Sequence, residues 1–149
     1  MNKDLIYLNM AKEMAKLSHC VKIKVAALIV KDGRILSTGI NGTPAGTTNC
    51  DEKFDAEFDR DLHHEFSTYN EIHAEMNAII FAAKYGVSID GATLYSVYQP
   101  CRNCLKHILN AGIKYIVYSE DYDLAGYTAD TYNLLKTLGV QITQVTAKP

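Results

Sequence analysis

The second half of the chain alternates between short apolar strands and helical segments, and this alternation constrains the fold more than any other feature. The expected strands are "ATLYSVY" (92–98), "KYIVYSE" (114–120) and "VQITQV" (140–145). Helices are expected between them at 101–111 and 128–138, ended by Gly112 and Gly139. Strands separated by helices favour a layered α/β structure, with helices on both faces of one sheet.

The first half adds a helix, a hairpin and a second long helix. Apolar residues recur at helical spacing over 3–17, and "KVAALIVKDGRILSTGIN" predicts two antiparallel strands joined by a turn at 31–33. We expect a loop over 42–50, an irregular excursion with a single helical turn over 51–72, and a helix over 73–85. Residues 1–149 are thus predicted to form one domain, a three-layer α/β/α structure with a central mixed five-stranded sheet.

Composition argues against several classes of protein. The 149 residues contain no apolar run long enough to span a membrane, and the N-terminal residues lack the apolar core of a secretory signal. We therefore expect a cytoplasmic protein, in the host cytoplasm if the source is viral. A net charge of −2 argues against a polynucleotide partner, which needs many cationic contacts to phosphates. In a reducing compartment, the four cysteines are expected to be ligands, nucleophiles or filler rather than a disulfide framework.

Two short motifs predict a metal centre. "QPCRNC" places Cys101 and Cys104 one turn apart at a helix start, so both sulfurs can reach one ion. The helix N-terminus favours their thiolate forms. His73 begins the preceding helix, and successive strand-to-helix junctions fall along the same edge of an α/β sheet. Three protein ligands with one open position are typical of a catalytic zinc, so we expect one Zn²⁺ per chain.

Glu75 is the predicted proton carrier of this centre. It follows His73 by two residues, so it can lie beside a metal-activated water, take its proton and pass that proton to a substrate. Taken alone, the cysteines could be a redox or structural pair, and His73 could be a helix cap. Together, H-x-E followed by P-C-x-x-C is a signature of zinc-dependent nucleobase deaminases.

Residues 18–145 resemble the cytidine and deoxycytidylate deaminase superfamily, and within it the deoxycytidylate deaminases. H-A-E and P-C-x-x-C belong to the whole superfamily, whereas "HAEMNAI", "NGTPAG…NC" and "AGIKYIVY" point to the nucleotide-specific branch. The resemblance implies a cytidine deaminase-like fold. It also implies a hydrolase that converts deoxycytidine monophosphate (dCMP) to deoxyuridine monophosphate (dUMP) and ammonia, with the product feeding thymidylate synthesis.

The resemblance also implies residues that contact the substrate. Asn41 would bind a sugar hydroxyl, and the backbone amide of Ala74 would face the pyrimidine edge. Lys22, helped by Ser18 and Tyr122, would bind the 5′-phosphate. Family members often carry Arg at the position of Lys22, and Lys lacks the bidentate fork of Arg.

Many relatives are hexamers that deoxycytidine triphosphate (dCTP) activates and thymidine triphosphate (dTTP) inhibits. The resemblance therefore implies a homo-oligomer, with the hexamer as its expected form, and Mg²⁺ accompanying the triphosphate effectors. The implied regulatory residues are Gly42, Thr43, Gly46, Asn49 and Cys50 in the glycine-rich loop, with Phe81 and Lys84 on the following helix.

The polar excursion contains further ligand-type side chains, and some relatives carry a structural zinc there. His63, His64 and Glu71, even with Cys50, give no clear tetrahedral set by their spacing. We therefore expect them to be solvated or hydrogen-bonded, and Cys20 to be structural.

Three other functions compete with this interpretation. A tRNA adenosine deaminase would need a basic groove, which the mildly acidic chain does not favour. A deaminase of free cytidine nucleosides would be indifferent to the 5′-phosphate. A zinc-stabilised binding module would need a fourth protein ligand and would leave Glu75 without a role.

Overall fold

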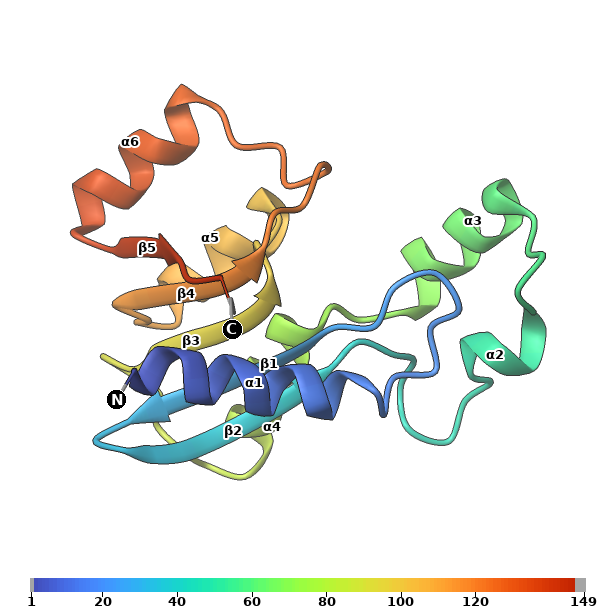
Figure 1. The fold of residues 1–149 in the computed structure, drawn as a ribbon, viewed down its shortest axis with the longest axis horizontal. Coiled ribbons are helices and arrows are strands. Elements are labelled where there is room, and N and C mark those ends of the chain that lie inside the picture. The colour runs from blue at the N-terminus through green and yellow to red at the C-terminus, as the bar shows by residue number, and fades with distance from the viewer. Residues whose placement is uncertain (1, 147–149) are drawn as a thin grey trace.

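Five strands form one mixed sheet in the computed structural model, which describes residues 2–146 (Figure 1). The strands lie in the order β2-β1-β3-β4-β5. Strand β1 is antiparallel to β2 and β3, whereas β3, β4 and β5 are mutually parallel. Their bounds are Ala26–Lys31 (β1), Arg34–Ile40 (β2), Thr93–Tyr98 (β3), Tyr115–Glu120 (β4) and Gln141–Gln144 (β5). The predicted mixed five-stranded sheet is confirmed.

Helices cover both faces of this sheet. Helix α1 (Lys3–Ala15) packs Leu8 and Ala11 on one face, against Leu28 of β1. Helices α4 (Ala74–Lys84), α5 (Arg102–Asn110) and α6 (Ala129–Leu138) cover the other face, where Ile29 lies. Strand β1 is therefore apolar along nearly its whole length, because both of its faces are buried. The predicted three-layer architecture is confirmed.

The single domain predicted over 1–149 stays a prediction, and its residues 1 and 147–149 lie outside the described residues. Within residues 2–146, no helix has the length and apolar character needed to cross a membrane.

The expectation of an irregular excursion over 51–72 is wrong. This segment contains the short helix α2 (Cys50–Lys53) and the eleven-residue helix α3 (Arg60–Asn70). The Asp59 side chain caps α3 by accepting hydrogen bonds from the backbone amides of Asp61 and Leu62. Only His63 and Phe66 of α3 are buried, so its apolar stripe is too narrow to stand out in the sequence.

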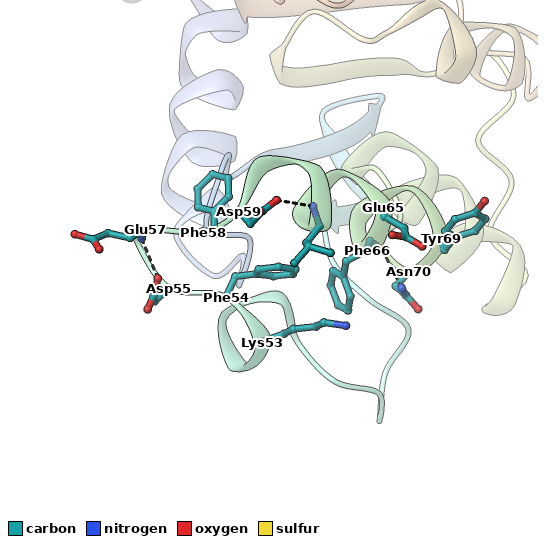
Figure 2. A pocket seen from close by; sticks show the side chains of 11 residues that line it. Lys53, Phe54, Asp55, Glu57, Phe58, Asp59, Glu65, Phe66, Tyr69 and Asn70 are labelled. Atoms are coloured by element: carbon teal, nitrogen blue, oxygen red, sulfur yellow. Dashed lines mark hydrogen bonds between the residues drawn. The ribbon is translucent and has the colours of Figure 1, made fainter.

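Helices α2 and α3 lie together at one end of the molecule, beyond the sheet (Figure 1). Aromatic residues join them, with the ring centres of Phe54 and Phe66 5.5 Å apart. A surface pocket there has an aromatic floor and an acidic rim that includes Asp55, Glu57 and Glu65 (Figure 2). It is separate from the cavity described below.

Helix α4 approaches β2 unusually closely at Gly39. A Cβ atom at Gly39 would overlap the carbonyl oxygen of Ala74 and the amide nitrogen of Ala78. The Ser37 hydroxyl donates to the Ala78 carbonyl at 2.7 Å, and the Asn77 amide donates to the Ile40 carbonyl at 2.8 Å. These contacts fix the start of α4 relative to the sheet.

Candidate active site

Three predicted metal ligands meet where α4 and α5 begin. His73 is the N-cap of α4, and Cys101 is the N-cap of α5. The His73 Nδ1 atom lies 3.1 Å from Cys104 Sγ and 3.6 Å from Cys101 Sγ. Ligand atoms around a tetrahedral zinc are about 3.5 Å apart, given the usual Zn–S and Zn–N bond lengths. The three side chains therefore fit one zinc ion.

The protonation of this trio favours metal binding. The hydrogen bond from Cys104, together with His73, lowers the pKa of Cys101 to about 4. The neighbouring Cys101 and burial raise the pKa of Cys104. The two sulfurs thus share one proton, which a bound cation would displace. The hydrogen bond with Cys101 raises the pKa of His73.

Glu75 lies beside this trio in a buried position. Its side chain is 4% exposed, and the Ser96 hydroxyl of β3 donates to its Oε1 atom at 2.7 Å. Burial raises the pKa of Glu75, and the hydrogen bond from Ser96 opposes that rise. A buried carboxyl group held beside the trio is placed to take up and release a proton during catalysis.

A cavity of about 790 Å³ opens over the trio and extends to α3. Its lining includes Lys22, Asn41, Ala74 and Tyr122, which are four of the five predicted substrate-binding residues. The sequence reasoning missed the contribution of α3, which supplies His64, Ser67 and Thr68 to the wall. These residues are one turn apart on a helix, so recognising α3 would have shown that they share a face.

Asn41 combines a structural role with capacity for a ligand. Its Oδ1 atom accepts from the Val25 amide and its Nδ2 atom donates to the Ile23 carbonyl, both at 2.9 Å. One N–H and one lone pair of the side-chain amide remain for a ligand. The Ala74 backbone amide lies in the first turn of α4, where helical amides have no partner within the helix.

Ser18 differs from the expectation for a phosphate-binding residue. It is buried, and it does not line the cavity within the described part of the chain. Its hydroxyl donates to the Asn41 carbonyl at 3.0 Å and accepts from the Cys20 amide at 3.2 Å. We therefore assign Ser18 to holding the backbone of this loop rather than to contacting phosphate.

The implied regulatory residues fall at two ends of α4. Gly42 pairs with Ile72 through two backbone hydrogen bonds, just before the helix begins. Phe81 and Lys84 lie exposed in its last turns. The loop itself is held by the Asn49 side chain, which accepts from the Thr43 hydroxyl at 3.5 Å, and Gly46 is exposed with a φ of 85°.

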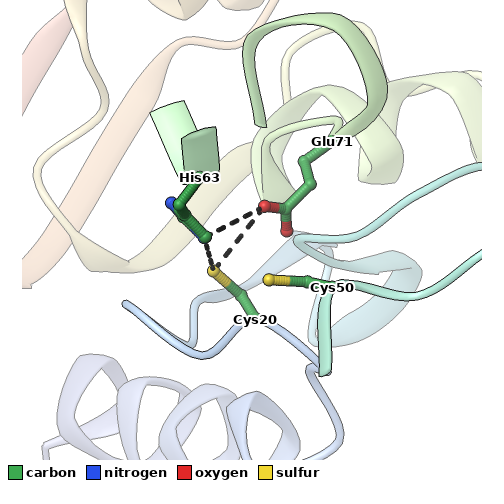
Figure 3. Close-up of side chains that lie close together, drawn as sticks. All are labelled: Cys20, Cys50, His63 and Glu71. Atoms are coloured by element: carbon green, nitrogen blue, oxygen red, sulfur yellow. Dashed lines mark hydrogen bonds and ion pairs between the residues drawn. The ribbon is translucent and has the colours of Figure 1, made fainter. Parts of the chain in front are cut away.

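Cys50 belongs to a second cluster rather than to the loop surface. Its sulfur lies with the ligand atoms of Cys20, His63 and Glu71, all within 4.8 Å of one another (Figure 3). Cys20 Sγ is 3.8 Å from both His63 Nε2 and Glu71 Oε1, which are themselves 3.7 Å apart. The expectation that the excursion offers no tetrahedral set is wrong. The set includes Cys20 and does not include His64.

The chemistry of this second cluster fits a metal ion. All four side chains are almost fully buried. Glu71 Oε2 has no hydrogen-bond partner among residues 2–146, although a buried carboxylate oxygen normally needs one. Two cysteines, one histidine and one carboxylate form a donor set suited to tetrahedral zinc. His63 lies in the first turn of α3 and Glu71 is its C-cap, eight residues later on the same face, a relation that an irregular segment would not provide.

Comparisons with known proteins agree with this geometry. Residues 1–120 match the family described as "Cytidine and deoxycytidylate deaminase zinc-binding region". The deoxycytidylate deaminase of Enterobacteria phage T2 is 38% identical, over 93% of this chain and 89% of that protein. ComE operon protein 2 of Bacillus subtilis is 39% identical, over 89% of this chain and 65% of that protein.

Among solved structures, the dCMP deaminase of cyanophage S-TIM5 in complex with dCMP and dUMP superposes with a TM-score of 0.76. It is 34% identical, and the match covers 97% of this chain and 99% of that one. The His73–Cys101–Cys104 trio beside a buried glutamate and the family match over residues 1–120 lead to the same conclusion: the chain belongs to the cytidine and deoxycytidylate deaminase family.

Proposed function

We propose that the protein is a zinc-dependent deaminase that converts dCMP to dUMP and ammonia. The observation that carries this proposal is the His73–Cys101–Cys104 trio beside buried Glu75, at the floor of a cavity lined by donors suited to a nucleotide. The relatives named deoxycytidylate deaminase and the neighbour solved with dCMP and dUMP support the choice of substrate.

The residues of this chain divide the work of the reaction. When bound by the trio, zinc supplies Lewis-acid activation of water. Glu75 accepts one proton from the attacking water and delivers it to the ring nitrogen. In a second transfer it carries the remaining hydroxyl proton to the amino group, which leaves as ammonia as the C–N bond breaks and the carbonyl forms. The Ser96 hydroxyl holds Glu75 Oε1 in place. The Ala74 amide donates to the pyrimidine edge, and Asn41 uses its remaining hydrogen-bonding capacity for the sugar.

The far end of the cavity is the proposed phosphate subsite. Lys22 supplies a cation there, and His64, Ser67 and Thr68 on α3 supply N–H and O–H donors. Such donors bind a phosphate well, and the nucleoside lacks this group. Tyr122 also lines the cavity and completes the proposed set, and burial raises its pKa, so its hydroxyl remains a donor.

We also propose that the Cys20–Cys50–His63–Glu71 cluster holds a structural zinc. Its four buried ligands would fill all four positions of a tetrahedral zinc and leave none for water or substrate. The measurement is the metal content of the purified protein. Two zinc ions per chain are expected, and one ion per chain would contradict this assignment.

Regulation and assembly are proposals that rest on the family. We propose that the protein is a homo-oligomer, namely a hexamer. We propose that dCTP activates it and dTTP inhibits it, each together with Mg²⁺. The enzyme would supply dUMP for thymidylate synthesis in the cytoplasm. Gly42 lies beside the start of α4, whereas Phe81 and Lys84 lie in its last turns. This separation supports a regulatory site that a second chain completes.

An ammonia-release assay tests the activity. We expect turnover of dCMP, much weaker turnover of deoxycytidine, and none with tRNA or single-stranded DNA. Glu75→Gln is expected to keep its fold and zinc while losing at least about a hundredfold in kcat, the usual contribution of a general acid–base. Equal kcat/KM for dCMP and deoxycytidine would overturn the preference for the monophosphate.

A further inference from the structure

We infer that the Cys20–Cys50–His63–Glu71 cluster positions the phosphate end of the substrate cavity and thereby sets the affinity for a nucleoside monophosphate. This inference rests on the proposed function. It assigns the cluster a task in substrate recognition in addition to holding the fold.

Three of the cluster residues lie within two positions of a residue that lines the cavity. Cys20 precedes Lys22 by two residues, and His63 precedes His64 by one. Glu71 precedes His73 by two, so the third connection leads to the catalytic trio itself. A metal ion bound by the cluster would therefore fasten the segment around Cys20 to both ends of α3, and the neighbouring residues of these parts line the cavity wall.

The phosphate end has little else to hold it. Among the described elements, α3 has no extensive contact with any other helix or strand. Its small core consists of Cys20, Cys50 and Phe66, with a few partly buried neighbours. An isolated helix of fewer than about 12–15 residues is only marginally stable in water, so α3 depends on these attachments. Residues 16–25, which carry Lys22, form neither helix nor strand.

Cys50 allows the cluster to be altered without touching the substrate cavity. Cys20, His63 and Glu71 all line that cavity, whereas Cys50 does not. Cys50 is the first residue of α2, and its sulfur lies beside that of Cys20 (Figure 3). A change in substrate affinity in a Cys50 variant would therefore act through the cluster or through the Val21 amide, which donates to Cys50 Sγ at 3.5 Å, rather than through a direct contact with the substrate.

The test is the Cys50→Ser variant, compared with wild type on dCMP and deoxycytidine. We expect zinc content to fall from two ions to one per chain. We expect KM for dCMP to rise at least about tenfold, with kcat changed less than about threefold, because the variant loses binding rather than chemistry. The kcat/KM for deoxycytidine, which has no phosphate, is expected to stay within about twofold. Amide hydrogen exchange should increase over 18–25 and 60–70 but not over β1.

A matched control is Asp51→Asn, which is next to Cys50 but changes only an exposed contact with His19. It should leave the zinc content unchanged, and also kcat and KM for both substrates. Phe66→Leu loosens α3 while keeping all four ligands, and Phe66 does not line the cavity. It is expected to raise KM for dCMP several-fold with two zinc ions retained, which keeps the idea testable if Cys50→Ser does not fold.

Three results would overturn the inference. The first is a Cys50→Ser protein with one zinc ion and unchanged KM for dCMP. The second is an equal loss on dCMP and deoxycytidine, which would mean general damage to the site. The third is a Phe66→Leu protein with faster exchange in α3 and unchanged KM for dCMP. A wild-type protein without dCMP deaminase activity would contradict the proposed function instead.

Discussion

At the scale of single residues, the site combines groups whose ordinary protonation is altered by their neighbours. Glu75 is buried against Ser96, while Cys101 and Cys104 share a proton near His73. These interactions depend on only a few atoms. Conservative substitutions can therefore separate positioning from chemistry.

Ser96→Ala tests the positioning of Glu75. The hydrogen bond from Ser96 favours the carboxylate and fixes its direction, so its loss should lower kcat for dCMP by about tenfold, corresponding to a charge-assisted hydrogen bond of about 1.4 kcal/mol. KM for dCMP and zinc content should stay close to wild type. Ser119→Ala is the matched control, because Ser119 is an equally buried strand serine on β4. A Ser96→Ala enzyme with wild-type kcat would show that Glu75 needs no such support.

At the scale of elements, the fold brings the starts of α4 and α5 to one edge of the sheet, and the sequence predicts some of these elements better than others. Buried strands were predictable because continuous apolar runs between glycines and prolines leave few alternatives. Helix α3 was not, because only His63 and Phe66 mark its buried face. The second cluster depends on that helix, so the sequence revealed its residues His63 and Glu71 but not their meeting with Cys20.

Gly39→Ala tests the contact between α4 and β2. The added Cβ would overlap the backbone of α4, and overpacking of this kind costs about 1–3 kcal/mol or more. We expect a lower urea midpoint and reduced deaminase activity, because α4 carries Glu75 in its first turn. Gly42→Ala is the control, since its Cβ would meet nothing within 4 Å. Equal stability of the two variants would contradict the close approach.

Tyr95 links α1 to the sheet and should make stability depend on alkaline pH. Its hydroxyl donates to Asp4 Oδ1 at 2.7 Å, and burial followed by that hydrogen bond raises its pKa. Below pH of about 10, the ordinary tyrosine value, both folded and unfolded chains keep the proton, so the full stability is present. Above it, only the unfolded chain loses the proton readily, so stability should fall as pH rises.

The measurement is the urea midpoint between about pH 8 and pH 11, on either side of the ordinary tyrosine pKa. Tyr95→Phe should lose less stability over this range than wild type. The control is Tyr85→Phe, because Tyr85 is 72% exposed and folding therefore buries little of its side chain. An identical pH dependence in wild type and Tyr95→Phe would assign the alkaline loss to other groups.

At the scale of the whole molecule, one chain contains a complete candidate catalytic site but only separated parts of the implied regulatory site. The trio, Glu75 and the cavity all come from one chain. The glycine-rich loop begins beside the start of α4, whereas Phe81 lies in its later turns with Ile80 and Tyr85 also exposed. Exposed apolar groups gathered on a helix end are typical of a contact between protein chains. The proposed catalysis therefore needs one chain, whereas the proposed regulation would need a second chain to complete its site.

Phe81→Asp tests this difference. A charge placed in an apolar contact between copies should lower the mass measured by light scattering and abolish the responses of dCMP turnover to dCTP and dTTP. The control is Ile6→Asp on α1, since Ile6 is 44% exposed and Phe81 is 41% exposed. Ile6→Asp should keep the wild-type mass and both responses. If Phe81→Asp keeps the wild-type mass yet loses both responses, Phe81 contacts the effector within one chain. If it keeps the mass and both responses, α4 takes no part in regulation, and the regulatory site must be sought at the loop alone.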